Sequence, residues 1–410
     1  MRSARKFLRA IAEVPTQITT EFYYADRRVG GLGTFKLADE ADVWIIARAT
    51  QLLSSKDTTI RAIFRKQLLN AIHNGFQKEH RPAILPVAAY LSGSTEGGMY
   101  RLQTGHTPKK TLWGAARDAA RRLKVRVDVS GDWNMSIIAE DVRFPPCKAV
   151  KGLHTAVRQH HTRRFTTVKF QGAVAATLAT DMTSAKFIAK LISTRTTLSR
   201  DDWPLLFRAR LESLPLRGYP WLGSKDKSCR RCRSDIETGS RNETGFHVFN
   251  NCEKNLQLYT TRHNLIQDEL VKILRLAGTS PEINKRLPGT DIEGRSRKPD
   301  IEFSMAGSRI MVDVTVAFDS SKNIEAAFQK KIEKYRSFGI IKPLVVGSLG
   351  FWHPKNDEIW SLAGINPKIW ARFKNKARTI AIEQSLNIFR SHVSSFPACT
   401  DPIVALGDDP

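Results

Sequence analysis

The sequence predicts an α+β protein of several domains: a mostly helical N-terminal part, a small cysteine-rich segment and a C-terminal part that contains strands. The chain has 410 residues, which is room for two or three domains of ordinary size. Apolar residues recur at helical spacing through the first third of the chain, whereas near residue 300 they alternate with polar residues, as in half-buried strands. With 41% hydrophobic and 26% charged residues, the chain has the composition of a folded protein.

The first part, residues 1–125, is expected to be mainly helical. Apolar spacing predicts amphipathic helices over residues 41–53, 60–72 and 112–123, the last with arginines on its outer face. The glycine-rich stretch 30–33 lacks the strand and helix that would frame a phosphate-binding loop. We therefore interpret it as a turn.

Three further parts follow along the chain. Residues 126–215 form a basic linker region that mixes short strand-like runs, such as 125–127, with helical stretches. Residues 216–255 form the cysteine-rich segment. A loop rich in proline, glycine and charged residues leads into its cysteines. Residues 256–410 begin with a long helix, continue through strands and end in a basic helix.

The charge of the chain predicts a polyanionic partner. Sixty-five Lys and Arg against 40 Asp and Glu give a net charge of +25, and residues 101–200 alone carry 19 basic and 6 acidic residues. Such a concentration favours a groove that follows a phosphate backbone, although the solvated surface of a basic protein is the alternative. No apolar run is long enough to span a membrane and no secretory signal is recognisable. The basic, amphipathic start of the chain leaves an organelle transit peptide as a minor alternative.

Three of the five cysteines form a cluster with a histidine. Cys229-x2-Cys232-x14-His247-x4-Cys252 has the spacing of a four-ligand tetrahedral zinc site, and four protein ligands make such a site structural. An odd number of cysteines without an export signal also favours a reducing compartment over a disulfide framework. The flanking arginines, 230, 231 and 233, predict a nucleic-acid contact. A chance arrangement of cysteines is the alternative.

Two alternating runs near residue 300 predict a β-hairpin. If Ala306 and Gly307 form its turn, Asp300 lies directly opposite Asp313. Two carboxylates in that arrangement repel each other unless a cation lies between them, and Mg²⁺ is the cation that prefers carboxylate oxygens and retained waters. The alternative is a solvated face of the hairpin. The core face would carry the apolar residues Ile301, Phe303, Ile310, Val312, Val314 and Val316.

Lysines follow on the next predicted helix. Lys330, Lys331 and Lys334 fall within five positions, so part of the set can share one face and reach the end of the hairpin. A lysine beside a metal-bound water stabilises an attacking hydroxide and the charge that develops on phosphorus. Solvated basic residues on a helix surface are the alternative for each of them.

These motifs resemble the restriction-like endonuclease of site-specific non-long-terminal-repeat (type-1) retrotransposons. The resemblance rests on Lys298-Pro299-Asp300, then on Val-Asp313-Val-Thr-Val, with twelve residues between Asp300 and Asp313, and then on Lys331-x2-Lys334-Tyr335. It implies a PD-(D/E)xK fold, a mixed sheet flanked by helices, in which Asp300 and Asp313 bind the catalytic metal. The usual lysine, two residues after the second acid, is replaced by Thr315. The resemblance assigns the role of this lysine to Lys331, with Lys334 as the alternative. The resemblance also implies that Tyr335 lines the site, although a core position is the alternative. Glu269 is a further candidate for an acidic residue of the site, supplied by the first helix of the fold.

The resemblance extends in both directions from the nuclease motifs. The cysteine array looks like the zinc knuckle that precedes this nuclease, and Arg262-His263-Asn264 fits the same pattern. Tyr24-x5-Gly30-Gly31-Leu32-Gly33 is similar to the start of the thumb, and Gln171-Gly172 looks like the linker that follows. A polymerase palm with its aspartate pair is not recognisable, so we expect no DNA polymerisation by this chain alone.

The resemblance implies a Mg²⁺-dependent nuclease that nicks target DNA to prime reverse transcription. Its implied partners are target DNA and element RNA, with no membrane, and its implied location is the nucleus, with the cytoplasm as the alternative. Two other functions stay open: a non-catalytic, zinc-containing nucleic-acid-binding remnant of a truncated element, and a chromatin or transcription factor that uses only the zinc knuckle.

Overall fold

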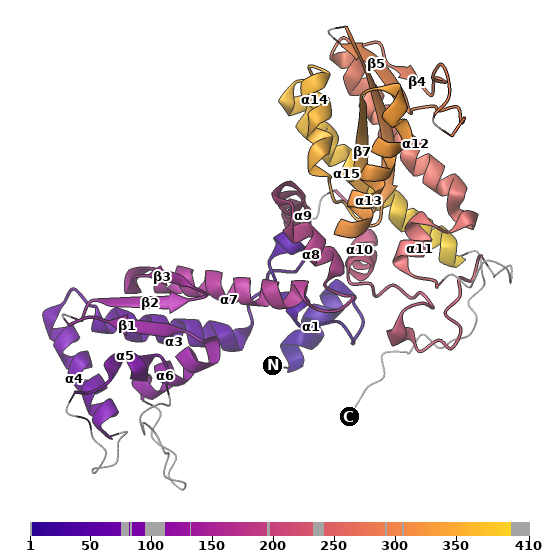
Figure 1. Ribbon diagram of the computed structural model, residues 1–410. Helices are drawn as coiled ribbons and strands as arrows, with labels where there is room; N and C mark the ends of the chain where they lie inside the picture. The colour runs from indigo at the N-terminus through magenta and orange to yellow at the C-terminus, as the bar shows by residue number, and fades with distance from the viewer. Residues whose placement is uncertain are drawn as a thin grey trace. The chain divides into compact units, whose positions relative to one another are not determined.

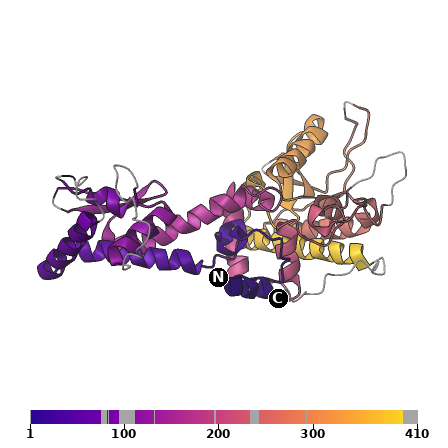
Figure 2. The same ribbon diagram turned by 90° about the horizontal axis from the view of Figure 1, so that it is seen from below.

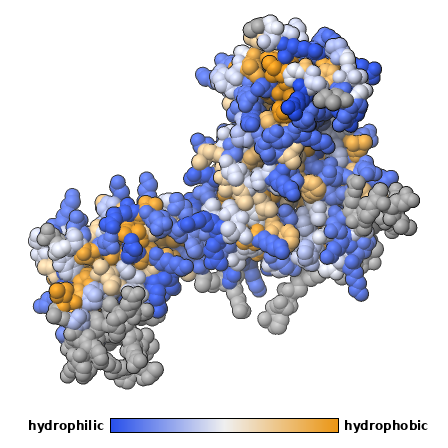
Figure 3. Space-filling view, viewed as in Figure 1, coloured by the Kyte–Doolittle hydropathy of each residue, from blue (hydrophilic) through white to orange (hydrophobic). Residues whose placement is uncertain are grey.

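The computed structural model describes residues 2–74, 82, 84–94, 111–131, 133–194, 197–232, 242–291, 293–305 and 307–394. The chain divides into two compact bodies (Figure 1). The N-terminal body comprises residues 23–26 and 31–164, and the C-terminal body comprises residues 2–22, 27–30 and the chain from residue 165 onward. The four parts expected from the sequence are finer than this division and stay predictions. On the face shown in Figure 3, hydrophilic residues cover most of each body.

The N-terminal body is a small three-stranded sheet surrounded by helices. The helices predicted over 41–53 and 112–123 are present, and 60–72 lies inside a longer helix. The strand-like run at residue 125 is the first strand of an antiparallel meander that the sequence only partly predicts. Its elements are α3 (Leu37–Leu53), α4 (Thr58–Asn74), α5 (Val87–Leu91), α6 (Leu112–Leu123), β1 (Arg126–Val129), β2 (Met135–Ala139), β3 (Val142–Phe144) and α7 (Ala149–Thr166).

Local chemistry explains the boundaries of these elements. The Thr111 hydroxyl accepts a hydrogen bond from the N–H of Gly114, which caps the start of α6. Lys124 ends the same helix in the left-handed conformation, with φ of 54°. One apolar core then joins α3, α6 and α7 to the sheet, through buried residues that include Val43, Ile46, Ala119, Ile137 and Leu153.

The C-terminal body begins with short helices and the cysteine-rich segment. The described part of this segment contains an isolated bridge between Ser228 and Asn242, one short α-helix and two 3-10 helices, and the rest is irregular. The helices up to the sheet are α1 (Arg2–Ala12), α8 (Ala173–Ala179), α9 (Met182–Thr194), α10 (Asp202–Arg210), α11 (Gly245–Asn250) and α12 (Leu256–Leu276), with α2 (Glu21–Tyr24) shared between the two bodies.

A four-stranded mixed sheet forms the centre of the C-terminal body. Its order is β4-β5-β6-β7, with antiparallel pairing except between β6 and β7, which are parallel and joined through α13. The long helix α15 runs across this body, in yellow in Figure 2. The bounds are β4 (Glu282–Ile283), β5 (Ile301–Met305), β6 (Ser308–Ala317), α13 (Ser321–Tyr335), β7 (Ile341–Gly347), α14 (Glu358–Leu362) and α15 (Pro367–Ser394).

The hairpin has the predicted register. Ile301 pairs with Val312 and Met305 pairs with Ser308, so the strands meet as the two-residue turn requires, although Ala306 itself lies outside the described residues. The six predicted apolar residues pack against α12 and α15 on one face of the sheet. On the opposite face, Met311 packs with Tyr335 of α13. The structure is therefore α+β with a mixed sheet between helices, and the acidic residues lie on the α13 side.

Candidate metal centre and carboxylate site

The four predicted zinc ligands lie together in the C-terminal body. One ligand atom from each of Cys229, Cys232, His247 and Cys252 falls within 4.8 Å of all the others. Cys232 Sγ is 3.4 Å from both His247 Nε2 and Cys252 Sγ, and Cys229 Sγ is 3.9 Å from Cys252 Sγ. The predicted constellation, three sulfurs and one imidazole nitrogen, is therefore present and could hold a metal ion.

Short local structures position these ligands. Cys229 and Cys232 lie on the turn that follows the bridge at Ser228. His247 lies in the first turn of α11, where the Thr244 hydroxyl accepts a hydrogen bond from its N–H. Cys252 follows the end of α11, and its N–H donates to a tyrosine hydroxyl 3.0 Å away, that of Tyr259 on α12. Backbone hydrogen bonds thus fix His247 and Cys252, and two further bonds link the ligands to one another: the N–H of Cys232 donates to Cys229 Sγ, and the N–H of Cys252 donates to the carbonyl oxygen of His247.

A second group of buried polar residues supports this cluster. His392, near the end of α15, has its Nε2 atom 3.7 Å from Cys229 Sγ and 3.0 Å from Glu243 Oε1. Glu243 is fully buried, and both its oxygens accept hydrogen bonds from the Arg230 guanidinium, at 2.8 and 2.9 Å. The Asn255 amide nitrogen lies 3.3 Å from the other ring nitrogen of His392. These contacts tie the end of α15 to the cysteine-rich segment.

The arginines beside the cysteines serve this packing. Arg230 is engaged with Glu243, and Arg231 donates to the Asn255 side chain at 2.8 Å. Arg233 lies outside the described residues. The nucleic-acid contact predicted for these arginines stays a prediction, and the structure adds an internal role for the first two.

The chemistry of the donor set fits a soft divalent cation. The hydrogen bond with Cys229, together with burial, raises the pKa of the Cys252 thiol well above its ordinary value. Three thiols this close cannot all ionise unless a cation compensates their charge. Zn²⁺ prefers such a set of thiolates and imidazole, and four protein ligands complete its tetrahedral shell. The cluster therefore fits a structural zinc ion.

The predicted pair of aspartates lies at the far end of the β-hairpin from its turn. Asp300 immediately precedes β5, Asp313 lies in the middle of β6, and their carboxyl groups are close enough for each to shift the pKa of the other. The Asp313 side chain is almost completely buried and that of Asp300 is only 14% exposed. The structure thus brings together the two acids that the sequence places in register.

Two of the three predicted lysines reach the same pair. Lys331 Nζ is 3.1 Å and Lys334 Nζ is 3.2 Å from Oδ2 of Asp313. Their spacing of three residues places both on the side of α13 that faces the sheet. Lys330 is exposed and makes no ion pair with another residue of the described chain. Thr315 lies two residues after Asp313, on the same face of β6.

The sequence did not assign a role to His263, which completes the site. Its Nε2 atom, on α12, lies 2.9 Å from Asp300 Oδ2, and the same carboxylate oxygen accepts the N–H of Val314 at 2.6 Å. Its place in the Arg262-His263-Asn264 pattern was the only indication in the sequence. Its neighbour Arg262 is buried and has a structural role, since it donates to the carbonyl oxygen of Phe249 and to the hydroxyl of Ser385.

The pKa values of the two carboxyl groups are shifted in opposite directions. Burial raises the pKa of Asp300, but hydrogen bonds from His263, Asp313 and a backbone N–H outweigh it, so that the pKa falls below its ordinary value. Burial and the neighbouring Asp300 raise the pKa of Asp313, against the opposing effect of Lys331 and Lys334. The pKa of His263 is raised by Asp300 despite the opposing effect of burial. One aspartate is therefore held ionised, and the other retains a proton more readily.

Tyr335 is a core residue that also borders the site. It is fully buried against Met311, and its hydroxyl donates to the carbonyl oxygen of Lys298 at 2.8 Å. The Lys334 ammonium lies 4.6 Å from the centre of its ring. Tyr335 therefore positions both the chain before Asp300 and one of the lysines. Glu269, the further acidic candidate, pairs with Lys272 at 2.8 Å, and no contact between it and the two aspartates is described.

Together, these side chains form a site with two oxygen donors, two ammonium groups and an imidazole. Oxygen donors suit a hard divalent cation such as Mg²⁺, which retains waters and can share a phosphate oxygen. Ammonium groups beside it can stabilise an anionic transition state. The arrangement is suited to hydrolysis of a phosphoester.

No helix within the described ranges is both long enough and apolar enough to cross a membrane.

Comparison with known proteins gives one distant similarity. The chain is 26% identical over 167 residues to the "Retrovirus-related Pol polyprotein from type-1 retrotransposable element R2" of Popillia japonica. The similarity covers 37% of this chain and 33% of the relative, so the chain matches about a third of that polyprotein's length. No protein-family model matches the chain. The similarity supports a relation to proteins of type-1 retrotransposons.

Proposed function

We propose that the chain is the endonuclease part of a retrotransposon polyprotein and that it nicks target DNA in a Mg²⁺-dependent reaction that primes reverse transcription. The observation that carries this proposal is the convergence of Asp300, Asp313, Lys331 and Lys334 at one end of a β-hairpin. The mixed sheet with α12 and α13 on opposite faces supports the PD-(D/E)xK arrangement. The relation to a Pol polyprotein supports DNA and element RNA as partners.

Each side chain has a role in this proposal. Asp300 and Asp313 supply carboxylate oxygens for a divalent cation, which would polarise the phosphodiester and activate a water molecule. Lys331 orients the attacking water and stabilises the developing negative charge, with Lys334 beside it. His263 fixes the orientation of the Asp300 carboxylate through their 2.9 Å contact. Tyr335 packs under Lys334 and limits its motion.

The cysteine cluster has a structural role in this proposal. Its four ligands leave no open position on a tetrahedral zinc ion, so it cannot supply the catalytic water. It holds the segment before α12 against α15 through Glu243 and His392. Because α12 carries His263, the cluster stabilises the helix that borders the carboxylate site.

A second candidate function is a non-catalytic nucleic-acid-binding protein from a truncated element. The ion pairs made by the aspartates favour it. Asp313 already contacts two lysines and Asp300 already contacts a histidine, so the site can persist without a cation. In that case the net charge of +25 would support DNA binding without cleavage.

Plasmid nicking with and without Mg²⁺ separates these functions. We expect the zinc-loaded wild-type chain to convert supercoiled DNA to the open circle only with Mg²⁺. We expect Asp300→Ala and Asp313→Ala to lower the rate by at least about a thousandfold, because a lost cation contributes several kcal/mol to the transition state. DNA affinity should change little in both variants. Undiminished nicking by both variants, or no nicking by the wild type, would refute the nuclease.

A further inference from the structure

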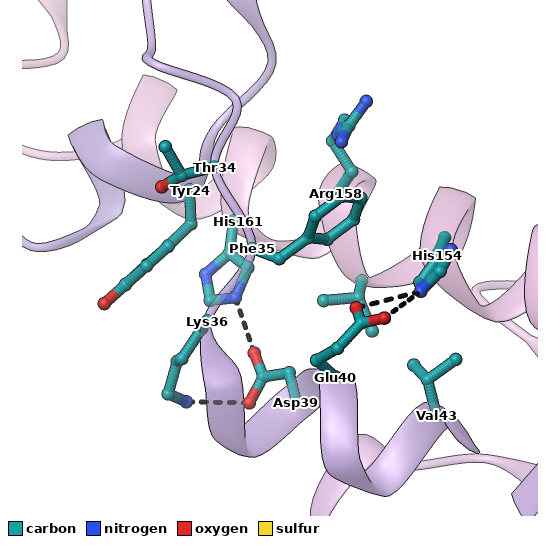
Figure 4. Close-up of a pocket in the computed structure, with 11 residues that line it drawn as sticks. Tyr24, Thr34, Phe35, Lys36, Asp39, Glu40, Val43, His154, Arg158 and His161 are labelled. Atoms are coloured by element: carbon teal, nitrogen blue, oxygen red, sulfur yellow. Dashed lines mark hydrogen bonds and ion pairs between the residues drawn. The ribbon is translucent and has the colours of Figure 1, made fainter. Parts of the chain in front are cut away.

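The N-terminal body presents a hollow between the start of α3 and the middle of α7. The two helices pack together through their apolar faces, with Val43 of α3 and Leu153 of α7 in one core. The hollow above this contact is shown in Figure 4, where side chains from both helices line it. It is distant in sequence from the carboxylate site, and neither the nuclease proposal nor the cysteine cluster uses any of its residues.

A half-exposed phenylalanine borders this hollow. The Phe35 side chain is 48% exposed although it borders a well-packed core. The His154 ring lies 4.8 Å from its ring centre, and the Arg158 guanidinium carbon lies 5.0 Å from it (Figure 4). These contacts hold the phenyl ring in place while leaving much of its surface to solvent.

A chain of contacts links this ring to a second exposed aromatic residue. The Glu40 carboxylate lies 2.9 Å from His154 Nε2 and accepts a hydrogen bond from Trp44 Nε1 at 2.8 Å. The Trp44 side chain is 54% exposed. Phe35, His154, Glu40 and Trp44 are therefore continuous on one surface. We call Phe35, Trp44, His154 and Arg158 the aromatic strip.

Positive charge surrounds the aromatic strip. Helix α7 carries four Lys and Arg residues and no Asp or Glu, and Arg48 follows Trp44 by one turn of α3. Among residues that the structure describes, no ion pair involves Arg48, Lys148, Lys151 or Arg158. Of the acids of the hollow, Asp39 pairs with the Lys36 ammonium and contacts His161, while Glu40 contacts His154 and is the acid that faces the strip. Arg48, Lys151 and Arg158, which lie on the two helices of the strip, thus outnumber its one acid, Glu40.

We propose that the aromatic strip binds single-stranded nucleic acid, with bases stacked on Phe35 and Trp44 and phosphates on the surrounding Lys and Arg side chains. Unpaired bases offer the flat faces that such rings recognise, and the phosphate backbone complements the cations. A duplex hides its base faces, so it can use only the cations. RNA and single-stranded DNA share this chemistry. The proposal does not depend on the nuclease activity, because its residues lie in the other body.

Fluorescence anisotropy with labelled oligouridine and oligothymidine of about 15 nucleotides tests the proposal, because such a strand covers a typical binding site. We expect the double variant Phe35→Leu, Trp44→Leu to bind both probes at least tenfold more weakly, since stacking of each base on an aromatic ring contributes substantially to affinity. Its affinity for a duplex of the same length should stay within about twofold, because the cations remain. Bromouridine cross-linking should also attach the probe to peptides that contain Phe35 or Trp44.

Two control variants make the result specific. Phe35→Tyr keeps the ring and should retain wild-type affinity. Leu37→Ala removes an exposed apolar side chain of the same region, 66% exposed, and should also bind as the wild type does. Wild-type binding by the double variant, an equal loss on the duplex, or an equal loss in Leu37→Ala would each overturn the proposal. Asp313→Ala should bind the single-stranded probes normally, so failure of the nuclease and failure of the strip are distinguishable.

Discussion

The cysteine cluster and the aspartate pair are two solutions to the same physical problem in one body. Each brings together groups that repel one another when ionised. The cluster gathers four donors and surrounds them with Glu243 and His392, both fully buried. The aspartate pair offers only two carboxylates, and Lys334 beside it remains 32% exposed. The cluster could fill every coordination position of a tetrahedral metal ion, whereas the aspartate pair would leave several positions free.

This difference separates a structural role from a catalytic one. A cation with four protein ligands has no position for substrate, whereas two carboxylates leave most of the shell of a hard cation to waters and phosphate oxygens. The two sites also differ in how the negative charge of their ligands is balanced. Lysines and a histidine balance the aspartates in part, but the pKa of Asp313 remains raised. The repulsion that remains is what a bridging cation would remove.

Removal of zinc should have the largest effect. Chelation, or Cys229→Ser, is expected to unfold the cysteine-rich segment and to loosen the end of α15, because a structural zinc ion contributes on the order of 10 kcal/mol of folding free energy. Limited proteolysis with mass spectrometry would locate the new cleavage sites. Cys147→Ser is the matched control, since Cys147 is exposed and lies outside the cluster. An unchanged cleavage pattern after chelation would contradict a structural metal site.

The lysines should show the next largest effect and sharpen the catalytic side of the comparison. We expect Lys331→Ala to slow nicking about a hundredfold and Lys334→Ala about tenfold, by loss of transition-state stabilisation. Lys334 is the more exposed of the two and is also held by the ring of Tyr335. Single-turnover nicking at saturating Mg²⁺ measures both rates.

Lys330→Ala is the matched control for these variants, because Lys330 lies on the same helix but points to solvent. It should nick within about twofold of the wild type, as expected for an exposed residue away from the site. If all three variants slow nicking equally, the lysines act only through general attraction of DNA, and the assigned roles are wrong.

The last prediction concerns Asp39 of the N-terminal body, a carboxylate that lies beside Lys36 and His161 and not beside a second acid. Burial raises the pKa of Asp39, but hydrogen bonds from His161 and Lys36 outweigh it, so that the pKa is lowered. Its stabilising contribution is therefore present above the ordinary pKa of an aspartate and is lost as the pH falls through the lowered value. Asp39→Asn should cost about 2 kcal/mol of unfolding free energy at neutral pH, as for a hydrogen bond to a charged group.

The difference between the Asp39→Asn variant and the wild type should shrink as the pH is lowered from about 6 to about 3. Urea unfolding, followed by hydrogen exchange in α3 and α7, measures it in the N-terminal body alone. A difference that does not depend on pH would show that Asp39 contributes by packing and not by charge. Asp39 thus contrasts with Asp313. Lys36 and His161 lower the pKa of Asp39, whereas burial and a second acid, Asp300, raise the pKa of Asp313.

Local patterns explain why much of this site could be predicted. The alternation of the two runs fixes which face of the hairpin is apolar, and the two-residue turn fixes the register that places Asp300 with Asp313. Helical spacing likewise predicts that Lys331 and Lys334 share a face. The spacing of the cysteines predicts the four zinc ligands because a knuckle and a short helix are local structures.

Contacts between distant segments could not be predicted in this way. His392 lies 163 residues after Cys229, and His263 lies 37 residues before Asp300, so no periodicity relates them. The small sheet of the N-terminal body was only partly indicated, because its strands are short and two of them follow tight turns. The aromatic strip needs α3 and α7 to pack together, which only the tertiary structure reveals.

The central claim is that Asp300 and Asp313 share a divalent cation, and Mn²⁺ binding to the zinc-loaded full chain tests it most directly. Electron paramagnetic resonance should show one Mn²⁺ bound per wild-type chain, and Asp300→Asn or Asp313→Asn should weaken that binding at least about tenfold, as expected when one of few protein ligands is lost. Glu269→Gln, which alters the acid paired with Lys272, should bind Mn²⁺ as the wild type does. Equal Mn²⁺ binding by the wild type and both aspartate variants would contradict the account.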